Sequence, residues 1–147
     1  MGLDMYLTAS RLIWQHDKRD QKIAMNIATQ FPDIPGRLKE VEYEVAYWRK
    51  ANAIHNWFVK NVQDGKDECE KFDVSIEQLQ SLVSACKSVL ARHSLAEKLL
   101  PPTSGFFFGN TDIDDWYFED LQKTINMLMP VIEADMTGWD IQYRSSW

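Results

Sequence analysis

The stretch RLKEVEYEVAYWRKANAIHNWFVKNVQ (residues 37–63) decides the fold, because it fits two kinds of secondary structure. In its first half Val41, Tyr43, Val45 and Tyr47 alternate with glutamates and an alanine, as they would in a strand. Over the whole window, apolar side chains also recur at steps of three and four, which is typical of a helix. A strand of this reach would be exceptional. We therefore predict one long central helix, ended by the Asp-Gly pair that follows.

The two ends of the chain have the pattern of half-buried strands. Apolar and polar side chains alternate over residues 3–7 and again over residues 139–145, and Gly138 supplies a turn residue before the second run. Pairing of the two ends in one small antiparallel sheet would hold both termini in place. Three phenylalanines between Gly105 and Gly109 predict a further, buried strand.

Helix signals mark much of the remaining chain. Residues 20–30 have a short amphipathic pattern, and Ser75 with Gln78 has the spacing of a capping box at the start of another helix. Aspartates within residues 112–115 open a last helix, where they suit the helix macrodipole. Pro130 is expected to kink that helix. The fold class predicted is α+β and mainly helical, with the long central helix and a small antiparallel sheet that involves both termini.

Composition limits the classes of function. The chain has 147 residues, which fits a single domain over residues 1–147, and a formal net charge of −6. This acidic balance argues against direct binding of nucleic acid, which normally needs a basic face. No apolar run approaches the roughly 18 residues of a membrane span. Asp4 stands where a signal peptide would carry basic residues, and Cys69 and Cys86 form no paired motif. We expect a cytoplasmic protein with two reduced thiols.

Complete catalytic signatures are missing from the sequence. It has no glycine-rich phosphate motif, no nucleophile elbow and no HExxH. The three histidines are far apart, and the acids Asp112, Asp114, Asp115 and Glu119 do not follow the layout of a calcium loop. We expect neither a metal nor a cofactor, and we interpret the acids as helix-capping residues.

The candidate site lies on the predicted central helix. Arg49, Lys50 and Lys60 could hold an anionic group, while Trp57 could stack on a planar ring, as for a nucleotide. Two polar residues, Asn52 and His55, interrupt the apolar stripe of the same helix. Buried polar groups need partners, so these two either bond to neighbouring elements or face a pocket. The predicted ligand-binding residues are Arg49, Lys50, Asn52, His55, Trp57 and Lys60.

Four stretches of the sequence together resemble a known family. They are MGLDMYL (residues 1–7), YWRKANAIH (residues 47–55), SGFFFG (residues 104–109) and SSW (residues 145–147). The chain is similar here to a family of small uncharacterised proteins of bacteriophages and prophage-bearing bacteria. The resemblance implies a phage origin and action in the host cytoplasm. It brings no assigned mechanism and no functional residues.

Three functions from different classes remain open. The first is a phage accessory protein without enzymatic activity, an inhibitor that binds a host protein or a small anionic, nucleotide-like ligand and so modulates a host process such as defence. The second is a small enzyme acting on a nucleotide-like substrate, with His55 as acid or base, helped by Asn52, Arg49 and an acid from residues 112–115. The third is a structural homo-oligomer, suggested by the many aromatic residues.

Overall fold

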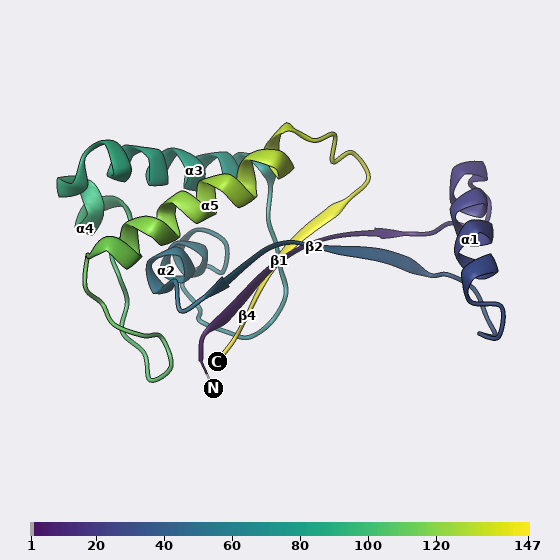
Figure 1. Ribbon diagram of the computed structural model, residues 1–147, viewed down its shortest axis with the longest axis horizontal. Helices are drawn as coiled ribbons and strands as arrows, with labels where there is room; N and C mark the ends of the chain where they lie inside the picture. Colours follow the sequence, from purple (N-terminus) through teal and green to yellow (C-terminus); the bar gives the residue numbers. More distant parts are fainter. Residues whose placement is uncertain (1) are drawn as a thin grey trace.

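The computed structural model describes residues 2–147, so Met1, the first residue of the stretch MGLDMYL, lies outside the described residues. It shows a four-stranded antiparallel sheet and five α-helices in a single domain (Figure 1). The elements, in chain order, are β1 (Asp4–Leu12), α1 (Lys18–Gln30), β2 (Glu40–Arg49), α2 (Asn52–Asn61), β3 (Phe72–Asp73), α3 (Ile76–Ala91), the 3₁₀ turn η1 (His93–Leu95), α4 (Ala96–Leu99), α5 (Asp115–Glu133) and β4 (Asp140–Ser146).

The predicted pairing of the two chain ends is confirmed. β1 lies between β2 and β4 in the strand order β2-β1-β4-β3, and Met5 pairs with Ser145 of the C-terminal strand. Side chains alternate as the sequence indicates, because Met5 and Leu7 of β1 are buried, as is Tyr143 of β4. The two termini therefore lie side by side in Figure 1.

The prediction of one long central helix is wrong. Residues 40–49 form strand β2, and helix α2 begins only at Asn52. Strand β1 offers a partner along the whole of β2, from Leu12 opposite Glu40 to Asp4 opposite Arg49. The resulting ladder satisfies the backbone of β2, and its β-branched and aromatic side chains suit a pleated surface. The helical part of the stretch is the buried one, since every residue of α2 from Asn52 to Phe58 is buried.

The strand predicted between Gly105 and Gly109 is also wrong. These residues form a loop with a turn, and the side chain of Phe106 is 95% exposed. Only Phe108 enters the core, where its ring stands edge-on to His55 at 5.2 Å. The fold is less helical than we expected, because less than half of the described residues lie in α-helices.

Helix signals in the sequence are confirmed where they rest on capping. Ser75 and Gln78 form the reciprocal capping box of α3, and Asp114 caps α5 by accepting from the backbone N–H of Tyr117. Helix α5 continues through Pro130 to Glu133. Among residues 2–147, no helix has both the length and the apolar character needed to cross a membrane.

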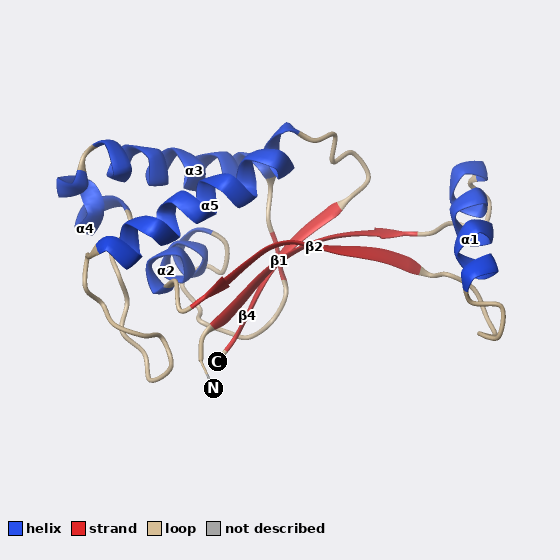
Figure 2. Ribbon diagram, viewed as in Figure 1, coloured by secondary structure: helices blue, strands red, loops and turns tan. Residues whose placement is uncertain are grey.

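The core lies between the sheet and helices α2 to α5, which gather on one side of it (Figure 2). Trp48 of β2 donates its indole N–H to Thr124 Oγ1 of α5 at 2.8 Å, which joins the sheet to that helix. Phe58 of α2 stacks on Tyr143 of β4 with ring centres 3.9 Å apart. Helix α1 lies away from this body, at the far end of the β1–β2 ribbon.

Candidate functional site

The site begins at the sharp turn between β2 and α2. Lys50 has a φ of 57°, a left-handed conformation that side chains other than glycine rarely adopt. The turn is held by backbone bonds, because Lys50 N–H donates to Leu3 O at 2.8 Å and Asn52 N–H donates to Lys50 O at 2.9 Å. A strained residue fixed in this way is a feature of binding and active sites.

Two glycines lie against Lys50 and leave room for it. A Cβ atom added to Gly2 would come within 3.2 Å of Lys50 Cε, and one added to Gly109 would lie 3.4 Å from Lys50 Cβ. Gly109 also has a φ of +81°, which favours glycine. The N-terminus and the loop before α5 therefore both form the surroundings of the Lys50 side chain.

Asn52 joins the same turn to the loop over residues 101–110. Its side-chain Nδ2 donates to Phe108 O at 2.9 Å and to Asn110 O at 2.8 Å, while its Oδ1 accepts from the backbone N–H of Thr103 at 3.1 Å. Asn52 is 5% exposed. Its amide is fully used by the protein, so Asn52 shapes the site and has little hydrogen-bonding capacity left for a ligand.

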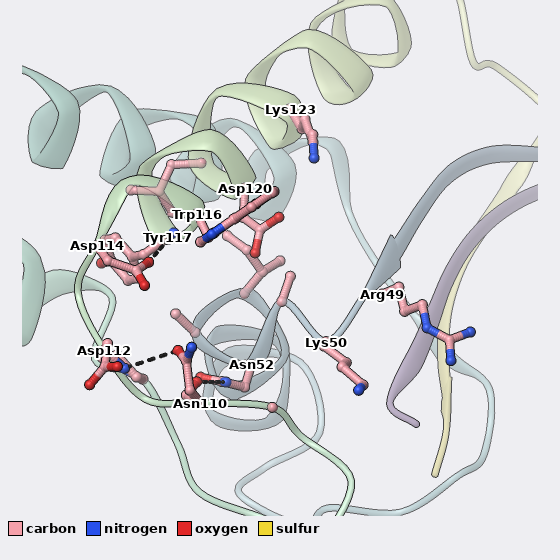
Figure 3. A pocket seen from close by; sticks show the side chains of 16 residues that line it. Arg49, Lys50, Asn52, Asn110, Asp112, Asp114, Trp116, Tyr117, Asp120 and Lys123 are labelled. Carbon is pink, nitrogen blue, oxygen red and sulfur yellow. Dashed lines mark hydrogen bonds between the residues drawn. The ribbon is translucent and has the colours of Figure 1, made fainter. Parts of the chain in front are cut away.

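A pocket of about 390 Å³ opens between this turn and the first turns of α5. Figure 3 shows Trp116, Asp120 and Lys123 on α5 on one side of it and Lys50 and Asn52 on the other, with the Lys50 side chain directed away from α5. The pocket is lined by residues 49–54, by Pro102, Gly109, Asn110 and Asp112, and by Asp114, Trp116, Tyr117, Asp120, Leu121 and Lys123. Its volume is in the range of sites for small molecules, which is about 300–1,000 Å³.

The charges around the pocket are mixed. Arg49 lies 3.5 Å from Asp4 with a half-exposed side chain, a pair that contributes little. Lys50 and Lys123 have no ion-pair partner within residues 2–147. Burial raises the pKa of Asp120 to about 6, Lys123 opposes this rise, and the nearby acids Glu119 and Asp114 add to it.

The N-terminus of α2 also opens into the pocket. Ala53 and Ile54 line it, and the N-cap residue Ala51 offers no side-chain oxygen to their backbone N–H groups. A helix start without a capping side chain carries free donors and a partial positive charge, so it attracts anions. Lys50 immediately before it adds a full positive charge.

His55 lies outside this pocket, in a separate buried cluster. Its side chain is 0% exposed, with Nδ1 2.7 Å from Tyr143 Oη and Nε2 2.9 Å from Asp67 Oδ1. Burial lowers the pKa of His55, and the charge of Asp67 opposes that effect. The ring is therefore neutral near pH 7, so Nε2–H donates to the carboxylate and Tyr143 donates its O–H to Nδ1.

Asp67 connects the His55 cluster to the surface. Its side chain is 34% exposed, and it also accepts from the indole N–H of Trp147 at 3.2 Å. The carboxylate partner expected of a catalytic histidine is thus present, and sequence spacing did not reveal it. The histidine itself is sealed from solvent and bonds to neighbouring elements, which is one of the two arrangements that we expected of it.

The remaining predicted residues do not line the pocket. Trp57 is buried in α2 and stands edge-on to Phe58, with ring centres 5.3 Å apart. Lys60 is exposed near the end of the same helix. The structure therefore brings Arg49, Lys50 and Asn52 together and leaves His55, Trp57 and Lys60 elsewhere. Binding of a ligand by any of the six stays a prediction.

Within residues 2–147, no three His, Cys, Asp or Glu residues are arranged to hold an ion. Cys86 is buried in α3, and burial raises its pKa to about 12, so it is an inert thiol. Cys69 is exposed and free.

Several site residues were missed by sequence reasoning. Trp116, Asp120 and Lys123 recur at steps of four and three on α5, which places them on one helix face. That spacing is a usable signal. Nothing in the sequence, however, indicates that this face meets the residues before α2.

Comparisons with protein-family models, with curated proteins and with solved structures give no match for this chain.

Proposed function

We propose that this protein binds a small nucleotide-like ligand in the pocket between the β2–α2 turn and α5, without turning it over. The observation that carries this proposal is one juxtaposition. The unpaired Lys50 and the uncapped start of α2 lie on one side of the pocket, and the indole of Trp116, 71% exposed, lies on the other.

The two sides suit the two halves of a nucleotide. A phosphate group would take charge-assisted hydrogen bonds from Lys50 and from the backbone N–H of Ala53. The exposed indole of Trp116 offers a face on which a base can stack. Carboxylates at the pocket, among them Asp112, can accept hydrogen bonds from the N–H groups of a base edge.

Binding without catalysis fits the arrangement of the site better than catalysis does. A general base must reach the substrate directly or through one water. The titratable histidine with an orienting carboxylate is His55, which does not line the pocket. The pocket supplies charge, stacking and one carboxyl group of raised pKa, that of Asp120, while its lining includes no histidine, cysteine or serine.

The biological role that we propose follows from the family resemblance. In a phage accessory protein, tight binding of a nucleotide-like ligand would withdraw that ligand from a host process, and defence is one such process. The partner is then the small anionic ligand itself, and binding of a host protein is the other form of the same proposal.

Isothermal titration calorimetry with purified protein tests ligand binding. The panel comprises nucleoside mono-, di- and triphosphates and cyclic nucleotides, with inorganic phosphate and free nucleosides as controls. We expect at least one nucleotide to bind more tightly than both its nucleoside and phosphate. Lys50→Gln and Trp116→Ala should each weaken that binding at least about fivefold, since a charge-assisted hydrogen bond or a stacked base contributes about 1–3 kcal/mol.

Lys60→Gln is the matched control, because it removes the same charge from an exposed lysine outside the pocket. Its affinity should equal that of the unchanged protein. If no nucleotide binds, or if Lys50→Gln binds as well as Lys60→Gln does, the proposal fails.

The runner-up is a small enzyme that uses His55. One observation favours it, namely the chain of hydrogen bonds from Tyr143 through His55 to the part-exposed Asp67. Such a chain orients an imidazole as it would for acid–base chemistry. Turnover of any nucleotide in the panel, abolished by His55→Gln in a folded variant, would establish the enzyme and overturn the binding proposal.

A further inference from the structure

Residues 11–39, which we call the tip, project from the body of the protein at the end of the β1–β2 ribbon. Figure 1 shows helix α1 of the tip far from the other helices. Of the described residues of α1, only Asp20 is buried. An isolated helix of 13 residues is marginally stable in water, so α1 depends on whatever else holds the tip.

Polar bonds give the tip a fixed internal structure. Arg11 donates to Asp20 Oδ1 at 2.6 Å, and the backbone N–H of Trp14 donates to Asp20 Oδ2 at 2.9 Å. Asp17 caps the helix by accepting from the N–H of Asp20, and Ile13 N–H donates to Lys39 O at 2.9 Å. The tip is therefore ordered by hydrogen bonds and an ion pair, with almost no apolar core of its own.

Most of the large apolar side chains of the tip are exposed. Met25 is 70% exposed, Phe31 61% and Ile34 71%, and together they border a groove of about 770 Å³. Of the eleven large hydrophobic residues that are exposed within residues 2–147, six lie in the tip. The tip is about a fifth of the chain, so this concentration marks an interaction surface.

Charge separates the tip from the rest of the chain. The tip holds six Lys and Arg against three Asp, a net charge of +3, while the remaining residues hold ten basic against nineteen acidic side chains, a net charge of −9. Glu40, Glu42 and Glu44 follow the tip along the chain and are all exposed on β2, where Glu42 pairs with Lys71 at 3.1 Å. Strand β2 is an edge of the sheet.

The outer surface of β2 also offers an apolar contact. Tyr43 is 60% exposed on the face of β2 opposite to that of Glu42 and Glu44, and its ring lies 5.7 Å from that of Trp139. One molecule thus carries a basic, apolar tip and an acidic, aromatic ribbon. The two surfaces complement each other, yet they lie along the same arm and cannot meet within one chain.

We infer that the tip docks on the β2 ribbon of a second copy of this chain, in a two-fold dimer with the two arms antiparallel. In such a dimer each tip meets the partner's ribbon, so the same contact forms twice. A standard interface involves about 20–30 residues on each side, which residues 11–39 with the exposed face of β2 can supply. The inference is independent of ligand binding in the pocket.

Sedimentation equilibrium over a concentration series tests the dimer. The unchanged chain should approach twice its monomer mass of 17.2 kDa. The double variant Met25→Asp/Ile34→Asp should raise the dimer dissociation constant at least about a hundredfold, because it removes two large apolar contacts. Phe106→Asp is the matched control, since Phe106 is 95% exposed on the body, and this variant should dimerise normally.

Charge exchange tests where the tip docks. The double variant Lys22→Glu/Lys39→Glu reverses the charge of the tip. The double variant Glu42→Lys/Glu44→Lys reverses the charge of the β2 ribbon. Each variant alone should be monomeric, because like charges then meet twice. An equimolar mixture should recover a mixed dimer, in which both contacts again join opposite charges. Added salt should weaken the original dimer.

Three results would overturn the inference. A strict monomer at every concentration would leave the tip to a different partner. Dimerisation of the Met25→Asp/Ile34→Asp variant at the original affinity would exclude the tip as the interface. Dimerisation of the ribbon-reversed variant alone would place the tip against something other than β2. Circular dichroism and thermal melting check that each variant keeps the folded body.

Discussion

The Asn52 side chain connects helix α2 to the loop over residues 101–110 at the proposed pocket. Replacing Asn52 therefore tests this connection directly. Asn52→Ala removes three hydrogen bonds that tie α2 to Phe108, Asn110 and Thr103. The bond to Phe108 is buried, and the other two are part-buried. Leaving one buried carbonyl unsatisfied costs about 1–3 kcal/mol, and each of the other bonds contributes about 0.5–1.5 kcal/mol. We therefore expect a loss of about 2–5 kcal/mol after the small gain in helix propensity.

Asn56 provides the matched comparison for this experiment. It lies one turn further along α2, is also buried, and makes a single side-chain bond to Pro101 O at 3.0 Å. Asn56→Ala should cost only about 0.5–1.5 kcal/mol. Urea unfolding followed by circular dichroism measures both values, with an unchanged slope as the sign that the transition stays comparable. If Asn52→Ala lowers the free energy of unfolding by no more than Asn56→Ala does, the three hydrogen bonds of Asn52 do not hold α2 to the loop as we infer.

Four further predictions concern titration and packing. The pKa of Asp120 is raised to about 6, so its ionised form disfavours the folded state. The stability of the protein should therefore fall as the pH rises from 4 to 6. Thermal melting at a series of pH values should show this fall, and Asp120→Asn should abolish it. The same protonation should strengthen anion binding below pH 6, which calorimetry at two pH values measures. Burial lowers the pKa of His55 from its usual 6.5. The contribution of neutral His55 to folding stability is therefore complete above pH 6.5 and is lost as the pH falls below that value. His55→Gln should remove this loss of stability at acid pH, as measured by thermal melting. Gly105→Ala should destabilise the protein by about 1–3 kcal/mol in urea unfolding, because the added Cβ would lie 2.6 Å from Phe108 Cγ; an unchanged midpoint would contradict this packing.

The sequence predicted elements whose signals are local. Alternation at the two termini was enough to place β1 and β4, because one buried face imposes a period of two on each strand. Ser75 with Gln78 located the start of α3, because a capping box is defined within four residues. These parts of the fold needed no knowledge of distant contacts.

The prediction for residues 37–63 was wrong because no sequence signal marks the boundary between β2 and α2. Lys50 makes the turn with a φ of 57°. A glycine or asparagine at this position would have indicated a turn in the sequence. Ala51 is a poor N-cap, so nothing marks the start of α2. The strand pattern of residues 41–47 was real, and β1 stabilises it as a strand. Because the helical spacing of apolar residues continues across both elements, we interpreted β2 and α2 as one helix.

Half of the pocket was also beyond the reach of sequence reasoning. Arg49 and Lys50 stood out by their charge, whereas Trp116 and Asp120 come from α5, more than sixty residues later. Their approach to the turn depends on how α5 packs on β2, including the bond between Trp48 and Thr124. Tertiary packing of this kind leaves no periodic signal in one chain.

Two-dimensional NMR of the indole N–H groups tests the central claim most directly. The chain has six tryptophans, and Trp116→Phe assigns the signal of Trp116. Titration with the best-binding nucleotide should shift the Trp116 signal and the backbone amides of Ala53 and Ile54 together, to saturation, while the signals of Trp14 and Trp57 stay in place. Shifts confined to the tip or to the His55 cluster, or no shift at all, would contradict a ligand in this pocket.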